Sequence, residues 1–270
     1  CWNLEQQGEQ SPRLLEGHLP RTRQIELQLG NTCNLSCIYC GPQFSSRWAE
    51  ITKDSDWTKI TQNNIIEANQ QRKEKVITWL LNSLSIKNPR RISTICITGG
   101  EPTIIEDFYK ICEKLLEPGL TIRINTNLMC PPQKLDRLIT LFQDLKNHGQ
   151  TIILRCSIDG TDKQQEWQRA PSIWSQIVSN LEALSSVVDW IIVSITVTPL
   201  TLESFAGLST WLNQATLPNL LIGQPSIVQD PDPLSPIPWY GVYREEIGYM
   251  VKLLESGKIL PANPTIPEYF

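Results

Sequence analysis

Three closely spaced cysteines, Cys33, Cys37 and Cys40, are the residues of this chain best suited to hold a metal centre. Three thiolates on one loop can bind three irons of a cubane cluster and leave the fourth iron open to an external ligand. Zinc is the competing interpretation, but structural zinc sites use four protein ligands. Because His18 and His148 lie far from any cysteine pair, the spacing favours a [4Fe-4S] cluster.

The remaining cysteines show no ligand spacing. Cys96, Cys112, Cys130 and Cys156 lie singly in or beside apolar segments, where a buried and unreactive thiol is the usual case. The sequence does not distinguish whether one of them donates hydrogen. The chain has 270 residues and no secretory signal pattern, so its eight cysteines indicate a reducing cytoplasm rather than a disulfide scaffold.

Composition narrows the class of partner. The net charge of -4 and the pI of about 5.4 give no long-range attraction for nucleic acid. No run of about 18 apolar residues is present, so we expect no membrane span. The first residue is Cys rather than Met, and we expect that part of the natural start is missing.

An alternation of strand and helix patterns must position these residues. The predicted strands are 24–29, 92–97, 120–126, 151–157, 190–197 and 219–223, and the predicted helices are 58–87, 107–116, 134–146, 174–187 and 205–214. Apolar strands separated by helices predict a parallel sheet in an α/β fold. Six alternations are too few for a closed eight-stranded barrel, so we predict a partial, open (β/α)6 barrel over residues 24–225.

Two further segments flank the predicted barrel. Residues 1–23 read as a polar N-terminal arm, and residues 226–270 as a short extension. Within the extension, prolines make 230–238 a loop, and 240–254 has a helical pattern.

The suggestive polar residues follow successive strands. The cysteine loop follows the first strand, Gly99–Pro102 the second, Asn125–Asn127 the third and Ser157–Gly160 the fourth. Ligands of parallel α/β folds bind at the carboxyl ends of the strands. We therefore predict a single site there.

The spacing C-x3-C-x2-C, with Tyr39 just before the last cysteine, resembles the signature of radical S-adenosylmethionine (SAM) enzymes. The resemblance covers about residues 24–225. It implies that Cys33, Cys37 and Cys40 hold a [4Fe-4S] cluster whose open iron is chelated by SAM. It also implies reductive cleavage of SAM to a 5′-deoxyadenosyl radical, with a reductant such as flavodoxin or ferredoxin, and hydrogen abstraction from an unactivated carbon.

The same resemblance assigns contacts to SAM. Gly99, Gly100, Glu101 and Pro102 match the family's GGEP stretch, where the glycines permit close approach and Glu101 is an acceptor for the amino group, although such a stretch alone is a common turn. The remaining candidates are Tyr39, Ser157 for the ribose, Asp159 for a hydroxyl or a turn, Arg169 for the carboxylate or the solvent, Asn125 for SAM, substrate or a cap, and Val197 for adenine.

The stretch Gly41–Trp48 resembles the CGP-x2-SS-x-W continuation of a poorly characterised group of these enzymes. Ser45 or Ser46 is a candidate helix cap, and Trp48 fits the core better than a substrate platform.

The substrate remains the open question. No cysteine follows Cys156, so we expect no auxiliary-cluster domain in this chain. The similarity of Ser157–Gly160 to peptide-modifying members favours a ribosomally made peptide or protein substrate, in an epimerase, cyclase or splicease, with a small partner subunit presenting the peptide. The alternatives are a small-molecule enzyme such as a carboxydeazaguanine synthase, and a non-enzymatic iron–sulfur or zinc scaffold.

Overall fold

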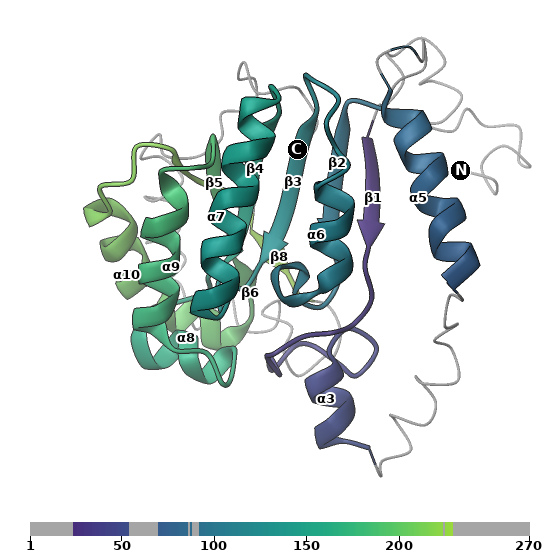
Figure 1. Cartoon of the computed structure of the whole chain (residues 1–270). Coiled ribbons are helices and arrows are strands. Elements are labelled where there is room, and N and C mark those ends of the chain that lie inside the picture. The colour runs from purple at the N-terminus through teal and green to yellow at the C-terminus, as the bar shows by residue number, and fades with distance from the viewer. Residues whose placement is uncertain (1–23, 54–69, 86, 88–91, 224, 229–270) are drawn as a thin grey trace, which may run out of the picture.

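The computed structural model describes residues 24–53, 70–85, 87, 92–223 and 225–228, and these contain a six-stranded parallel sheet (Figure 1). The strands are β1 (Gln24–Gln28), β2 (Thr94–Thr98), β3 (Thr121–Thr126), β4 (Thr151–Ser157), β5 (Trp190–Ser194) and β7 (Leu220–Ile222). They lie in the order β1-β2-β3-β4-β5-β7, so each strand pairs with the next strand of this sheet in chain order. This arrangement confirms the predicted α/β fold with a parallel sheet.

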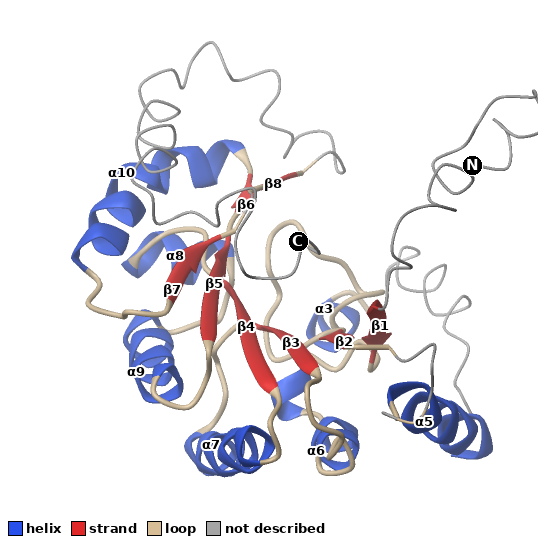
Figure 2. Ribbon diagram, turned by 90° about the horizontal axis from the view of Figure 1, so that it is seen from above, coloured by secondary structure: helices blue, strands red, loops and turns tan. Residues whose placement is uncertain are grey.

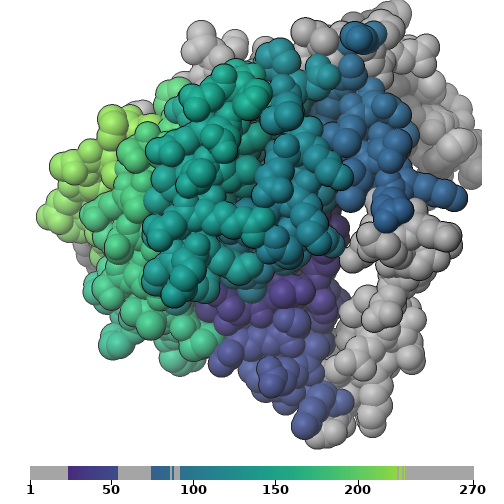
Figure 3. Space-filling model, viewed as in Figure 1, coloured from purple at the N-terminus to yellow at the C-terminus, as the bar shows by residue number. Residues whose placement is uncertain are grey.

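Helices cover one face of the sheet, which is called the outer face. They are α5 (Gln70–Leu84), α6 (Glu106–Cys112), α7 (Pro132–Asn147), α9 (Trp174–Ser185) and α10 (Pro199–Gln214). Figure 2 shows the strands curving away from these helices, and Figure 3 shows α6, α7 and α9 packed into a continuous surface. Ile97, Ile124 and Leu154 face this layer and are fully buried in the core. The outer face therefore forms the hydrophobic core.

The opposite face, called the inner face, carries a different set of side chains. Side chains alternate between faces along a strand, so Cys96, Arg123 and Arg155 point away from the helices. Cys96 is buried but absent from the contiguous hydrophobic cluster, which contains its sequence neighbours Ile95 and Ile97. Polar and charged groups thus share the inner face with apolar side chains such as Ile153.

Three predicted elements are wrong in their extent, and one of them is the helix expected at 107–116, which ends as α6 at Cys112. The strand expected at 190–197 is divided, because β5 ends at Ser194 and β6 (Thr196–Val197) pairs instead with β8 (Ser226–Ile227). The Thr196 amide donates to Asp159 Oδ1 at 2.7 Å, which removes it from the ladder of the main sheet. Helix α10 begins at Pro199 rather than at 205, because the Thr198 and Thr201 side chains form a capping box ahead of it.

The sequence pattern gave no signal for one helix. Helix α8 (Asp162–Gln168) is short and polar, so no apolar periodicity predicts it. Helix α3 (Ser46–Ile51) begins as predicted after Ser45, whose hydroxyl accepts from the Trp48 amide.

Some predictions lie outside the described residues. They concern the N-terminal arm, most of the first half of the helix expected at 58–87, the loop at 230–238 and the helix at 240–254. Among the residues that are described, no helix has both the length and the apolar character needed to cross a membrane.

Candidate functional site

The cysteine loop lies between β1 and α3, beyond the carboxyl ends of the strands (Figure 1). Helix α3 holds this loop in place through its first turn. The indole Nε1 of Trp48 donates to the Cys37 carbonyl at 2.8 Å, and the Ser45 hydroxyl donates to the Leu35 carbonyl at 2.6 Å. Ser46 Oγ bonds both the amide and the carbonyl of Cys33, at 3.1 and 3.2 Å. Trp48 is partly buried and acts as an anchor of the cysteine loop.

Gly99 and Gly100 lie directly against the start of this loop. A Cβ on Gly100 would meet the Thr32 carbonyl oxygen at 2.2 Å, and one on Gly99 would meet the Gly30 carbonyl oxygen at 2.6 Å. Gly99 also has a φ of 129°, which favours glycine. The Gly100 amide donates to Gly30 O at 2.9 Å and the Glu101 amide to Thr32 O at 2.8 Å. Both glycines are therefore required for the loops after β1 and β2 to touch.

Glu101 is 1% exposed and fixes the loop after β3. Its Oε1 accepts from the amide and hydroxyl of Thr103 and from the Thr126 hydroxyl, and its Oε2 accepts from the Asn127 amide at 2.6 Å. Burial raises the pKa of Glu101, and these four donors oppose that rise. The carboxylate that sequence reasoning assigned to the SAM amine thus has four partners within the chain, and it joins the ends of β2 and β3.

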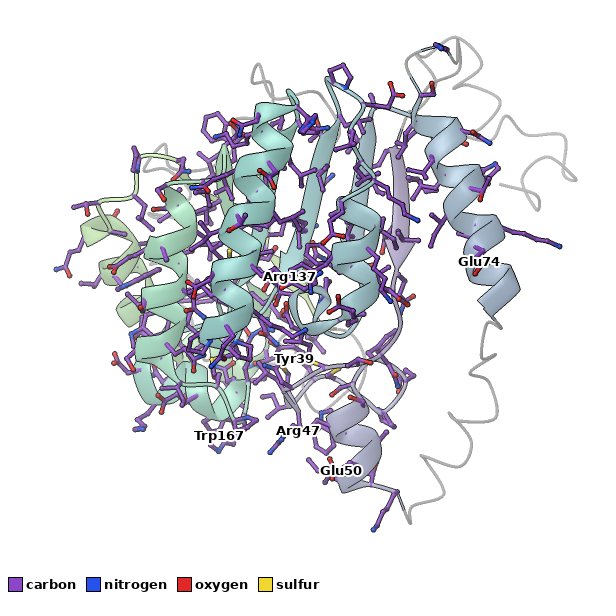
Figure 4. All side chains as sticks on the ribbon, in the orientation of Figure 1. Tyr39, Arg47, Glu50, Glu74, Arg137 and Trp167 are labelled. Carbon is purple, nitrogen blue, oxygen red and sulfur yellow. The ribbon has the colours of Figure 1, made fainter. Side chains whose placement is uncertain are left out.

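Asp159 is fully buried and accepts hydrogen bonds from three segments. The donors are the Tyr39 hydroxyl, Arg169 Nε at 2.7 Å and Nη2 at 3.2 Å, and the Thr196 amide at 2.7 Å. Burial, the largest single effect, acts to lower the pKa of Arg169, but Asp159, Tyr39 and Cys37 together outweigh it and raise that pKa. Tyr39, Asp159, Arg169 and Thr196 are called the strand-end network. Figure 4 shows Tyr39 beneath the strand ends, whereas Arg47 and Glu50 extend outward from α3.

The strand-end network reaches the cysteine loop. Arg169 Nη1 lies 3.9 Å from Cys37 Sγ, and its guanidinium lies 5.2 Å from the centre of the Tyr39 ring. On the other side of the loop, Asn127 Nδ2 lies 3.9 Å from Cys33 Sγ. Donors aimed at sulfur stabilise a thiolate and tune a cluster that it ligates.

The three cysteines supply the thiol groups that a cluster binds, and cluster binding would have to displace their protons. Burial raises the pKa of Cys33 and of Cys40, and it raises that of Cys37 to about 12 against the opposing charge of Arg169. Neighbouring thiols contribute to the rise for Cys37 and Cys40, so the three groups sense one another. Within the described ranges, no three such side chains are close enough for one metal ion. Four iron atoms of a cubane separate their ligand sulfurs more widely than one ion does.

The other predicted site residues are placed as follows. Ser157 and Asn125 are half-buried on the inner face, at the ends of β4 and β3, and Val197 is buried in β6. Pro102 is buried at the start of a single 3₁₀ turn, Pro102–Ile104. Cys112 and Cys156 are in the outer core and Cys130 is buried after β3, whereas Cys96 lies on the inner face.

Sequence reasoning missed the glutamines of α8. Gln165 is fully buried, and its Oε1 accepts from the amides of Asp159 and Gly160 at 2.8 and 3.3 Å. Gln168 bonds the hydroxyls of Ser204 and Thr201 on α10. The only local signal is that both lie within one turn before Arg169. Gln165 holds the turn that presents Asp159, and Gln168 joins α8 to α10.

The family model described as the Radical SAM superfamily matches residues 27–212 of this chain. The chain belongs to the radical SAM superfamily. Its members use a [4Fe-4S] cluster and SAM, which confirms the predicted cofactors. Membership in this enzyme superfamily also favours an enzyme over the scaffold alternative.

Two solved radical SAM structures share the fold. Native anSMEcpe with bound AdoMet has a TM-score of 0.58 and 14% identity, covering 88% of this chain and 62% of that chain. Streptococcus suis SuiB has a TM-score of 0.55 and 13% identity, covering 90% and 50%. At these identities the likeness shows the fold alone, which is the predicted partial barrel.

One curated relative is similar in sequence. The 7-carboxy-7-deazaguanine synthase of Rickettsia prowazekii (strain Madrid E) is 32% identical over 103 residues, which is 38% of this chain and 35% of that protein. The chain therefore spans less than two thirds of each of these three proteins.

Proposed function

We propose that this radical SAM protein cleaves SAM reductively and abstracts hydrogen from a ribosomally made peptide or protein. The observation that carries the first half is the backbone contact between Gly99–Gly100 and Gly30–Thr32, directly before Cys33. It unites the cysteine trio and the GGEP stretch, two motifs about 60 residues apart, in one site at the strand ends.

Cys33, Cys37 and Cys40 would hold the cluster. When bound, the cluster and SAM together supply a 5′-deoxyadenosyl radical. The chain's own part is to orient and to shield: the Leu35 amide, 3.5 Å from Cys33 Sγ, and Arg169 Nη1 offset thiolate charge. The indole of Trp48 fixes the loop from the far side.

The inner face and the strand ends would receive SAM. The proposed contacts are Tyr39, Gly99, Gly100, Glu101, Pro102, Asn125, Ser157, Asp159, Arg169 and Val197. Two of them change role: the Glu101 carboxylate and the Asp159 carboxylate have internal donors, so they position loops while neighbouring backbone groups face the ligand. Arg169 keeps Nη1 directed at Cys37 rather than at Asp159.

Likeness to a peptide-binding fold supports the substrate class. Streptococcus suis SuiB, which shares this fold, has been solved bound to its precursor peptide SuiA. The reaction would be of epimerase, cyclase or splicease type, in the cytoplasm. A small partner subunit would present the peptide, and a flavodoxin or ferredoxin would supply the electron.

A small-molecule substrate is the second candidate, and one observation favours it. The relative that is 32% identical over 103 residues is a 7-carboxy-7-deazaguanine synthase.

Cluster and radical chemistry are tested on reconstituted protein with matched cysteine variants. We expect about four iron and four sulfide per chain, and 5′-deoxyadenosine from SAM and dithionite. Cys37→Ala should abolish both, whereas Cys112→Ala, at a fully buried core position, should keep the cluster. Equal cluster content in the two variants would overturn the assignment.

The substrate class is tested by co-expression with short peptides encoded beside the gene, followed by mass spectrometry. A SAM-dependent mass change that is lost in Cys37→Ala supports a peptide substrate. Formation of 7-carboxy-7-deazaguanine without any peptide mass change supports the second candidate.

A further inference from the structure

Two arginines lie side by side on the inner face of the sheet. Arg123 of β3 is in register with Ile153 of β4, and Arg155 lies two residues further along β4, on the same face. Arg155 is in register with Asn125 and lies one inner-face position before Ser157. Both cations are therefore within one pleat of the residues proposed to receive SAM, and they lie deeper along the strands.

Arg155 makes little use of its donors. Its guanidinium carries five N–H groups, and in the described part of the chain its one hydrogen-bond partner is the Ser194 hydroxyl, 3.1 Å from Nη2. Ser194 is neutral, so it does not balance the charge. A half-buried guanidinium with a neutral partner is costly unless an anion completes it.

The surrounding charges reinforce this imbalance. Burial lowers the pKa of Arg155, and the neighbouring Arg123 lowers it further, which outweighs the opposing effects of Cys96 and Glu26. Glu26 is exposed on β1, three strands from β4 or about 14 Å by strand spacing, and accepts from the Thr98 hydroxyl. Among the described residues, burial and the neighbouring Arg123 together therefore disfavour the charged form of Arg155.

We propose that Arg155, assisted by Arg123, binds a carboxylate of the substrate on the inner face. The planar fork of a guanidinium matches a carboxylate through two parallel hydrogen bonds. The inference rests on the proposed function, in that this face is where a substrate would meet SAM. The carboxylate belongs either to an acidic residue of a peptide or to a small free acid, and the two sources can be separated.

The test compares acids with matched amides on the cluster-loaded full chain, by calorimetry with SAM at saturation. The peptide probes are acetyl-Ala-Asp-Ala-amide and its Asn counterpart, and the small probes are succinate and succinamide. We expect at least one acid to bind about tenfold or more tightly than its amide, the value of a charge-assisted hydrogen bond. The acid that binds more tightly identifies the source of the carboxylate.

Variants of Arg155 test whether the preference for acids over amides depends on this residue. Arg155→Gln should remove the preference, Arg155→Lys should keep part of it, and Arg47→Gln, at an exposed position of α3, should retain it in full (Figure 4). Thermal unfolding confirms that each variant is folded, and Arg155→Lys carries the test if Arg155→Gln is not.

Three outcomes would overturn the proposal. They are the absence of an acid preference with SAM at saturation, its persistence in Arg155→Gln, and an acid preference found only when SAM is left out, which would assign the cation to SAM itself. Failure of the proposed function is detected by a different measurement. In that case the wild-type enzyme would form no 5′-deoxyadenosine, while the acid preference would remain.

Discussion

Two arginines, Arg169 in the strand-end network and Arg155 on the inner face, are treated differently by the fold. Arg169 is 7% exposed and shares two hydrogen bonds with a fully buried carboxylate. Arg155 is half-buried and bonds a serine hydroxyl. A cation completed by its own chain holds structure together, whereas a cation left incomplete is available to a ligand. Within one polar region, Arg169 is therefore a structural residue and Arg155 is a candidate ligand-binding residue.

The largest effect on stability is expected from a substitution that disrupts the strand-end network. Asp159→Asn leaves Arg169 buried without its countercharge, so it should lower the free energy of unfolding by about 3–5 kcal/mol. Urea denaturation measures this. Asp107→Asn, at an exposed ion pair with Lys110, is the control and should change stability by no more than about 0.5 kcal/mol. A similar loss in both variants would remove the distinction.

The inner face should be packed less tightly than the outer core, and two neighbouring isoleucines test this. Ile152 and Ile153 are neighbours on β4, buried on opposite faces, and only Ile152 belongs to the contiguous core cluster. Ile152→Ala should cost about 2–5 kcal/mol of unfolding free energy. Ile153→Ala should cost clearly less, because fewer core contacts are lost. Equal costs would mean that Arg155 lies in a closed core.

Replacing Arg155 on the inner face should change the free energy of unfolding in the opposite direction. Without ligand, Arg155→Gln should raise the free energy of unfolding by about 1 kcal/mol, because it removes a poorly compensated, half-buried charge. The control is Arg137→Gln, which should lower stability slightly by removing ion pairs to Glu106 and Glu113. A loss of stability on replacing Arg155 would show that this side chain is structural.

The smallest effect on stability is expected from removing one hydrogen bond of the strand-end network. Tyr39→Phe removes one donor to Asp159 but keeps the ring beneath the Arg169 guanidinium. The free energy of unfolding should be about 0.5–1.5 kcal/mol lower than that of the wild type. The cluster should still assemble, and its absorbance after reconstitution checks that. Loss of the cluster would give Tyr39 a part in the site beyond its hydrogen bond.

Much of the fold could be predicted from local pattern. The six parallel strands of the main sheet and the flanking helices follow from apolar runs and periodicity, and the predicted cap at Ser45 is present. The errors have tertiary causes. The division of the strand at 190–197 depends on a carboxylate 37 residues away, and the early start of α10 on a capping box of two threonines.

The sequence alone determined the candidate cluster ligands and the edge of the sheet where they lie. Cysteine spacing is local, and strand alternation follows from backbone geometry, so both are readable without coordinates. Only the tertiary structure decided that Tyr39 meets Asp159 across 120 residues, that Gly100 packs on Thr32, and that Arg155 faces inward beside Arg123. These contacts join segments far apart in the chain, and register between strands fixes them.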